Sequence, residues 1–321
     1  MSSSATAMMP ATRSRIKIYS VSSVVPQSGP LAAAYAACEA LAQSHYENFP
    51  VASRLLPARM RPHIAAVYAF ARIADDIADE GHEPPAIRHA QLSAWQQLLH
   101  DAVADDRIDR PAASRDALMM TALGHTIRSL DLPLSLFDDL VSAFGQDITT
   151  NRYLSWSDVF DYCRRSANPV GRLVLRIAGY RDERLDRSSD AFCTALQLTN
   201  FWQDFGRDWR AGRLYVPFEV ALRAGAREHD LAAEHWTPGW TTAMDACIAT
   251  TRDLFERGRF VCDGVGGRLR FELRVTWHGG MCVLNRVNRV RHSLLTVRPK
   301  LHGRDVPVLL WRAMRWGGAA A

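Results

Sequence analysis

The sequence predicts an all-α protein folded as one helical bundle. Apolar residues recur with helical spacing along most of the 321 residues, and no run alternates apolar with polar residues as a half-buried strand would. The connections between the periodic segments are short, which favours one bundle over two separate domains. Because a bundle carries its functional groups between facing helices, we expect a central active-site cavity.

Long apolar-periodic segments define the expected helices, and boundary residues support several of them. The segments begin near Leu31, Pro62, Ala86, Ala112, Pro133, Trp156, Ser188, Trp240 and Leu269. Gly81, followed by Pro84 and Pro85, predicts the end of one helix. Asp131 precedes the start of another helix, and Gly179 predicts a third boundary.

The charge of the chain is unevenly distributed. The formal net charge is only +5, which does not by itself indicate nucleic acid as a partner. Residues 268–321, however, hold eleven Lys and Arg against Glu272 and Asp305, a local charge of +9. Such a region is suited to a membrane surface or an anionic substrate, or it forms a solvated basic helix face.

We divide the chain into residues 1–30 as a disordered leader, 31–300 as the helical domain and 301–321 as a basic C-terminal tail. The uncharged stretch 18–38 is broken by Pro26 and Pro30, so it predicts neither a spanning helix nor a clean signal peptide. The six cysteines are scattered without a C-x-x-C pair, which is typical of reduced thiols. We therefore expect a cytoplasmic protein, with peripheral membrane contact as a further expectation.

The first acidic motif lies inside an apolar helical run. Asp75 and Asp79 are four residues apart, so a helix places both carboxylates on one face, together with Arg72. Like charges at this spacing destabilise a bare helix by a few tenths of a kcal/mol, roughly, so a cation is expected between them. For a single pair of this kind, a solvated surface would be the simpler interpretation.

The second acidic motif repeats the pattern. Asn200, Asp204 and Asp208 recur every four residues and predict a stripe of oxygen ligands along one helix face. Hard oxygen ligands from two facing helices suit Mg²⁺, which takes its remaining ligands from water and from substrate phosphates. Two such sets in apolar and aromatic surroundings favour a shared metal site over solvated surface acids.

Four segments together resemble the squalene/phytoene synthase family. Residues 75–79 and 200–208 are similar to its two aspartate-rich motifs, and residues 162–171 resemble its Tyr-Cys…Val-Gly segment. Residues 212–217 are similar to its Gly-Arg-x-Tyr-x-Pro segment. The likeness runs from about His45 to Lys300, with the motifs in the expected order.

Two segments are similar to one branch of this family, the hydroxysqualene synthases (HpnC) of hopanoid biosynthesis. These are residues 47–53 and 200–204, where Gln203 replaces the Arg of most phytoene and presqualene diphosphate synthases. A condensation must hold two diphosphates, whereas opening of a presqualene-type substrate involves only one. A neutral Gln203 beside a metal ligand therefore argues against efficient condensation.

The resemblance implies an isoprenyl diphosphate synthase with the isoprenoid synthase type of helical fold. The implied reaction is Mg²⁺-dependent ionisation of presqualene diphosphate and capture of the carbocation by water, giving hydroxysqualene and diphosphate without NADPH. Several Mg²⁺ ions are expected to bridge the diphosphate. The alternatives are head-to-head condensation of farnesyl or other prenyl diphosphates, as in presqualene diphosphate or phytoene synthases, and a non-catalytic scaffold.

The resemblance also assigns residues. The implied metal ligands are Asp75, Asp79, Asn200, Asp204 and Asp208, and the implied catalytic residues are Tyr162, Asp75, Asp79 and Asp204. The substrate contacts are expected at His45, Phe49, Arg72, Tyr162, Gln197, Gln203, Arg213 and Tyr215. A structural role for His45 stays open.

An aromatic wall is expected to shield the carbocation. Its candidates are Phe49, Phe70, Phe144, Tyr162 and Phe201, and for each of the four phenylalanines alone the ordinary core is the simpler interpretation. Tyr162 stands apart because it belongs to a family motif. Arg165 occupies a position where many relatives carry a further aromatic residue.

Overall fold

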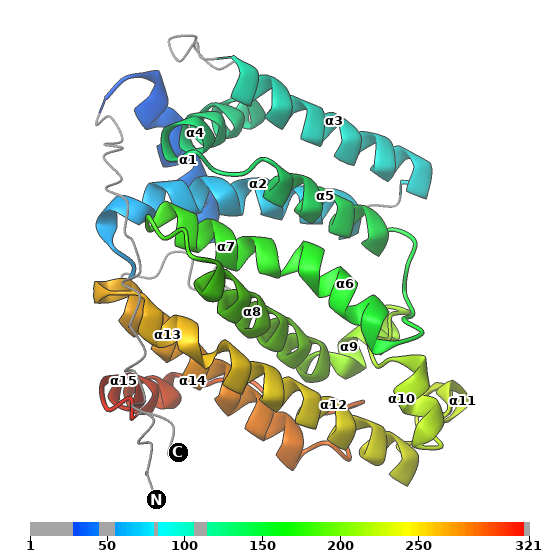
Figure 1. The fold of residues 1–321 in the computed structure, drawn as a ribbon. Coiled ribbons are helices and arrows are strands. Elements are labelled where there is room, and N and C mark those ends of the chain that lie inside the picture. Colours follow the sequence, from blue (N-terminus) through cyan, green and yellow to red (C-terminus); the bar gives the residue numbers. More distant parts are fainter. Residues whose placement is uncertain (1–27, 45–54, 80–82, 106–113, 318–321) are drawn as a thin grey trace, which may run out of the picture.

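The computed structural model describes residues 28–44, 55–79, 83–105 and 114–317, and these fold as a helical bundle (Figure 1). No β-strand occurs within those ranges; a single parallel bridge joins Arg152 to Leu214. The predicted all-α class is therefore confirmed. Residues 1–27 of the expected leader lie outside the described part of the chain.

The helices account for most of the described residues. In chain order they are α1 (Pro30–Ser44), η1 (Ala58–Met60), α2 (Arg61–Asp79), α3 (Pro85–Ala104), α4 (Arg115–Leu130), α5 (Ser135–Asp147), α6 (Trp156–Ser166), α7 (Asn168–Ile177), α8 (Glu183–Gln203), α9 (Phe205–Arg210), α10 (Phe218–Arg223), α11 (Glu228–Ala232), α12 (Pro238–Arg257), η2 (Gly258–Phe260), α13 (Val261–Gly264), α14 (Gly267–Arg289), η3 (Gly303–Asp305) and α15 (Val306–Met314).

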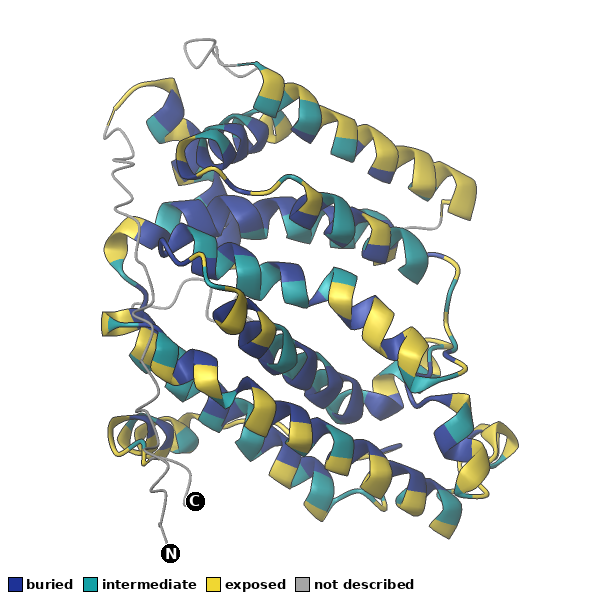
Figure 2. Ribbon diagram, in the orientation of Figure 1, coloured by how far each residue is buried: buried dark blue, intermediate teal, exposed yellow. Residues whose placement is uncertain are grey.

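Helix α8 forms the centre of the bundle. It packs against α6 and α7 on one side and against α12 and α14 on the other (Figure 1). Helices α1 to α5 pack on one another and form the N-terminal part of the fold. Figure 2 shows α8 coloured mostly as buried or intermediate, whereas α3 and α15 carry exposed faces. The first aspartate-rich motif lies at the C-terminal end of α2, and the second begins at the C-terminal end of α8.

Local sequence signals fix the helices that carry the site. Ser155 caps α6 as part of a capping box with Asp158, in which each side chain accepts from the other residue's backbone N–H. Asp182 caps α8 by accepting from the backbone of Arg184 at 2.9 Å. Gly179 has a φ of 87°, the left-handed conformation that ends α7 at the predicted boundary.

Two glycines allow close approach at the site. A Cβ on Gly171 would lie 2.3 Å from the Ser189 hydroxyl, so only glycine lets α7 pack this closely on α8. A Cβ on Gly206 would lie 2.3 Å from the carbonyl oxygen of Leu295. Gly206, inside the second acidic motif, thus lets the segment after α14 cross directly over α9.

The C-terminal part of the described chain packs on the bundle. Helix α15 lies against α14, burying Leu309 and Ala313. Within the described ranges, no helix combines the length and apolar character that a membrane crossing requires. All six cysteines carry free thiols, as their spacing predicted. The division into leader, domain and tail stays a prediction.

Candidate active site

The first acidic motif occupies the last turn and a half of α2. Asp75 and Asp79 share a face of the helix with Arg72, as their spacing predicted. Arg72 pairs with its own helix: one guanidinium nitrogen lies 3.5 Å from Asp75 Oδ2, and another lies 2.6 Å from Asp76 Oδ1. The Arg72 guanidinium, a predicted phosphate contact, therefore lies beside the candidate metal ligands.

The second acidic motif spans the junction of α8 and α9. Helix α8 ends at Gln203, and α9 begins at Phe205. Hydrogen bonds of helical spacing nevertheless continue through the junction, from Asp204 N to the Asn200 carbonyl at 2.8 Å and from Asp208 N to the Asp204 carbonyl at 2.9 Å. The predicted stripe is thus present although the helix is interrupted. The Asn200 amide also donates to Asp204 Oδ2 at 3.1 Å.

Arg213 connects the two motifs. Its guanidinium lies 3.1 Å from Asp79 Oδ1, and its backbone N–H donates to the Asp208 carbonyl at 2.7 Å. The residue follows α9 in the predicted Gly-Arg-x-Tyr-x-Pro segment, which the bridge from Leu214 to Arg152 and a hydrogen bond to Asn151 hold in place. Arg213 and Asp79, which are 134 positions apart in the sequence, are thereby joined.

A second arginine reaches the motifs from the C-terminal segment. Arg298 pairs with Asp204 through two guanidinium nitrogens, with Nη2 3.2 Å from Oδ2. Gln203 holds this segment, because its side-chain amide donates to the Pro299 carbonyl at 2.7 Å. Gln203 therefore contacts the backbone beside Arg298 in this structure. Its contact with substrate phosphate stays a prediction.

Two of the carboxylates, those of Asp75 and Asp208, lie in an environment that disfavours their negative charge. Burial, and then the neighbouring charge of Asp79, raise the pKa of Asp75 to about 6. Burial, and then the charge of Asp204, raise the pKa of Asp208 to about 7. A divalent cation would relieve both effects, and the donors are the hard oxygens that Mg²⁺ prefers. The residue set therefore fits such an ion.

The described residues do not present a ready-made metal cage. Across the ranges that the structure covers, no three His, Cys, Asp or Glu side chains converge as a metal-binding group. Each motif instead meets a guanidinium, Arg213 at Asp79 and Arg298 at Asp204. His45 and Phe49, the two substrate contacts predicted upstream, lie outside the described residues. Gln197 is half-buried on α8, one turn before Asn200.

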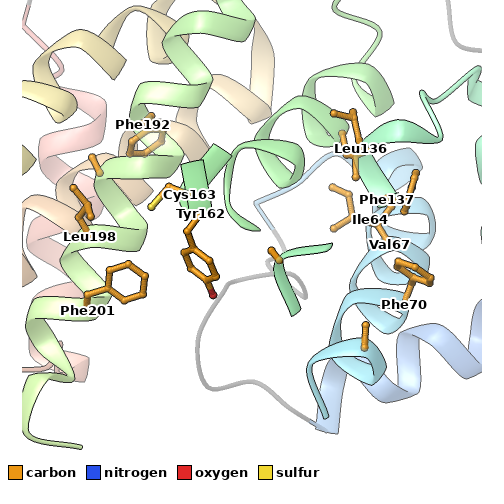
Figure 3. Packing of buried hydrophobic residues seen from close by; sticks show 14 of the residues in the cluster. Ile64, Val67, Phe70, Leu136, Phe137, Tyr162, Cys163, Phe192, Leu198 and Phe201 are labelled. Atoms are coloured by element: carbon orange, nitrogen blue, oxygen red, sulfur yellow. The ribbon is translucent and has the colours of Figure 1, made fainter. Parts of the chain in front are cut away.

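Aromatic rings cluster beside the acidic motifs. Phe201 and Tyr215 stack in parallel with their centroids 3.7 Å apart, and Tyr162 lies 6.1 Å from Phe201 and 6.3 Å from Tyr215. Tyr153 stacks on Tyr215 at 5.7 Å. Figure 3 shows the Tyr162 side chain leaving α6 next to Phe201, with its hydroxyl at the far end. Tyr162 and Phe201, two of the five residues predicted to form the wall around a carbocation, meet in this cluster.

Phe70, another predicted wall residue, lies outside this cluster. Its ring stacks on Trp95 at 5.8 Å and meets Phe137 edge-on at 5.7 Å, so the core alternative holds for it. In Figure 3 it lies with Phe137, apart from Tyr162 and Phe201. Phe144 is half-buried against the core. Arg165 is turned towards α5, where it donates to the Ser142 hydroxyl at 2.9 Å.

Asp147 is a polar residue of the site that the sequence reasoning missed. It is the last residue of α5, and its Oδ2 accepts a hydrogen bond from the Tyr162 hydroxyl at 2.7 Å. An acid is disfavoured at a helix C-terminus, where the helix dipole is negative. That unfavourable position is the signal by which Asp147 could have been found.

Comparison with known proteins identifies relatives over the part of the chain that contains both acidic motifs. A profile of the squalene/phytoene synthase family matches residues 42–312. The hydroxysqualene synthase of Zymomonas mobilis is 37% identical over 215 residues, which is 66% of this chain and 68% of that protein. The hydroxysqualene synthase of Sinorhizobium fredii is 34% identical over 233 residues, 71% of this chain and 75% of that protein.

Solved structures agree with the sequence comparison. The squalene synthase HpnC from Alicyclobacillus acidocaldarius superposes with a TM-score of 0.74 at 37% identity, covering 81% of this chain and 95% of that one. A dehydrosqualene synthase superposes with a TM-score of 0.75 at 21% identity, covering 89% and 96%. The latter likeness concerns the fold alone.

Proposed function

Because the chain belongs to the squalene/phytoene synthase family, we propose that it ionises presqualene diphosphate and lets water capture the carbocation, releasing hydroxysqualene and diphosphate without NADPH. The family makes the chain an isoprenyl diphosphate synthase-type enzyme of isoprenoid biosynthesis. The more specific reaction draws support from the hydroxysqualene synthases at 34% and 37% identity. The observation that carries it is the pair of acidic motifs joined by Arg213 beside the aromatic cluster.

The two motifs are the part of the site that would receive the diphosphate. Asp75, Asp79, Asn200, Asp204 and Asp208 would hold Mg²⁺, which when bound neutralises the leaving diphosphate as a Lewis acid. Arg213 and Arg298 already lie at the motifs, one on Asp79 and one on Asp204. Both guanidinium groups would be suited to bind phosphate oxygens of a diphosphate held at these carboxylates.

The aromatic cluster would protect the carbocation. Tyr162, Phe201 and Tyr215 would line the path of the cation with aromatic surface, and Tyr162, whose ring is tilted and not stacked on Phe201 and Tyr215, would offer its π face. Burial, and then the charge of Asp147, keep the pKa of Tyr162 well above its ordinary value, so the phenol stays neutral. His45 and Phe49 remain predicted contacts of the diphosphate and of the prenyl chain.

Gln203 would influence how many diphosphate groups the site can bind. Its amide is engaged by Pro299, and it adds no positive charge to the site. A site with a neutral residue here is better matched to one diphosphate than to two, so we propose that farnesyl diphosphate is condensed poorly. Efficient formation of presqualene diphosphate from farnesyl diphosphate would contradict this part of the proposal.

The decisive experiment separates the two half-reactions. Purified protein and Mg²⁺ are incubated in one tube with presqualene diphosphate and in another with farnesyl diphosphate, both without NADPH, and the products are identified by mass spectrometry. Hydroxysqualene from the first tube and no C30 product from the second are expected. A C30 or C40 diphosphate or polyene formed by condensation would instead assign the chain to the alternative activity.

We further propose that α15 places the enzyme on an anionic membrane surface. Its outer face exposes Val306, Val308, Trp311 and Met314, with Trp311 51% and Met314 67% exposed. Arg312 and Arg315 are exposed on the same helix, and the Arg315 guanidinium lies over the Trp311 ring. The nearest acid in the sequence, Asp305, is paired with Arg286 at 2.6 Å. An apolar face bordered by cations is typical of interfacial helices.

A further inference from the structure

Asp147 and Tyr162 form a hydrogen-bonded pair at the wall of the site. Tyr162 donates to Asp147 Oδ2 at 2.7 Å, which leaves Oδ1 as the second acceptor of the carboxylate. Oδ1 is buried from solvent and accepts no hydrogen bond from any residue in the described ranges. A buried acceptor without a donor costs free energy, so the pair marks a place where a polar group of a ligand fits.

The pair lies between the two functional parts of the site. On one side are the rings of Tyr153 and Tyr215, which lie 5.7 Å and 6.3 Å from the Tyr162 ring. On the other side, the charges of Asp79 and Arg213 act on Asp147. Asp147 is therefore next to the expected path of the carbocation but outside both metal-binding motifs.

Water capture needs a group of this kind. When a water oxygen attacks the carbocation, the C–O bond that forms leaves a proton in excess on the oxygen. Asp75, Asp79 and Asp204 of the two motifs are paired with arginines, and the Tyr162 phenol holds its own proton. A carboxylate with one free oxygen, kept in place by a phenol, is suited to accept it.

Burial of the Asp147 carboxylate is consistent with this role. Burial raises the pKa of Asp147 to about 7, whereas the hydrogen bond from Tyr162 opposes the rise. A carboxylate whose pKa approaches neutrality is a stronger base than an ordinary one and loses its proton again near neutral pH.

We propose that Asp147 is the general base that takes the proton from the water capturing the carbocation, with Tyr162 as its positioning residue. This inference rests on the proposed function. In the step, diphosphate has departed with its bonding pair, a water lone pair forms the C–O bond, and one water proton moves to Asp147 Oδ1. The products are the alcohol and diphosphate, and the proton on Asp147 then returns to solvent, so atoms and charge balance.

The test compares Asp147→Asn with the wild type on presqualene diphosphate. Asparagine keeps an oxygen for the Tyr162 hydroxyl but cannot accept the proton. We expect kcat for hydroxysqualene to fall by about 10²- to 10⁴-fold, with KM nearly unchanged. Asp138→Asn is the matched control, because Asp138 lies on the same helix and pairs instead with Gln96 and His100. It should behave as the wild type.

Chemical rescue separates a base from a structural acceptor. Asp147→Ala leaves space for a small carboxylate, so formate should restore part of the lost kcat in this variant and none in Tyr162→Phe. Unchanged kcat in Asp147→Asn, or an Asp147→Ala enzyme that folds by circular dichroism and gains nothing from formate, would overturn the role of Asp147. A wild type that leaves presqualene diphosphate untouched would contradict the proposed function instead.

Discussion

Arg298 lies on Asp204, with its Nη2 3.2 Å from the carboxylate Oδ2, and so brings a cation from the C-terminal segment into the second acidic motif. In Arg298→Gln, a competitor of Mg²⁺ at Asp204 is lost along with a donor for phosphate oxygens. We expect Mg²⁺ to bind the substrate-free enzyme several-fold more tightly and KM to rise about tenfold or more, since a bond to a charged group is removed. Calorimetry and steady-state kinetics measure the two effects.

The control for this variant is Arg257→Gln, because Arg257 pairs with Asp253 on the exposed face of α12. It should change neither quantity. If Arg298→Gln weakened Mg²⁺ binding, Arg298 would be holding Asp204 in position for the metal instead of competing with it.

Removing a carboxylate from either motif should lower turnover strongly while preserving the fold. Asp79→Ala and Asp204→Ala each remove a predicted ligand, and each also relieves charge repulsion with a neighbouring acid. We expect kcat to fall by about 10²-fold or more with an unchanged far-UV circular dichroism spectrum. Excess EDTA should have the same effect on the wild type. Full activity in either variant would disprove the metal assignment.

Mg²⁺ affinity should depend on pH through Asp75 and Asp208. Their pKa values are raised to about 6 and about 7, so the metal-free protein holds protons there below neutral pH, and bound metal must displace them. Affinity should therefore fall as pH drops from 8 to 6. The stability of the metal-free fold should conversely rise as pH falls through these pKa values, because the folded chain then binds more protons than the unfolded chain.

Proton release is the direct measure of this linkage. Calorimetric titration with Mg²⁺ near pH 6.5, in two buffers of different ionisation enthalpy, should give a positive number of protons released. Asp208→Asn should reduce that number. Equal enthalpies in the two buffers would show that both carboxylates are already ionised.

Helix α15 should bind vesicles that contain anionic phospholipid and should bind neutral vesicles weakly. High salt should reduce the binding, because the basic side chains are exposed and their charges are screened. Co-sedimentation of Arg312→Gln/Arg315→Gln and of Trp311→Ser/Met314→Ser separates the charged from the apolar contribution. Binding by both double variants at the wild-type level would exclude α15 as the contact.

The fold was largely predictable from the sequence because long helices have strong periodic patterns. The expected starts near Pro62, Ala86 and Trp156 lie within one residue of the starts of α2, α3 and α6. The start near Ser188 is five residues late, since capping by Asp182 extends α8 beyond its most apolar part. Short helices such as α9 and α13 escape notice because fewer than two turns define no period.

The site was predictable where its residues repeat at helical spacing and hidden where they meet through tertiary contacts. Both acidic motifs could be found locally. Arg298 could not, because 94 residues separate it from Asp204 and its own segment is irregular. The partner of Gln203 was equally hidden, since a sequence gives no indication that the Pro299 carbonyl lies beside it.

The close crossing at Gly206 also has a consequence for how the enzyme is made. The backbone of Leu294 and Leu295 rests on α9, so the second motif gains its arginine only after residue 298 has left the ribosome. Chains fold from the N-terminus during synthesis, and the earlier helices can pack before this happens. A nascent chain thus carries both acidic motifs before Arg298 can reach Asp204.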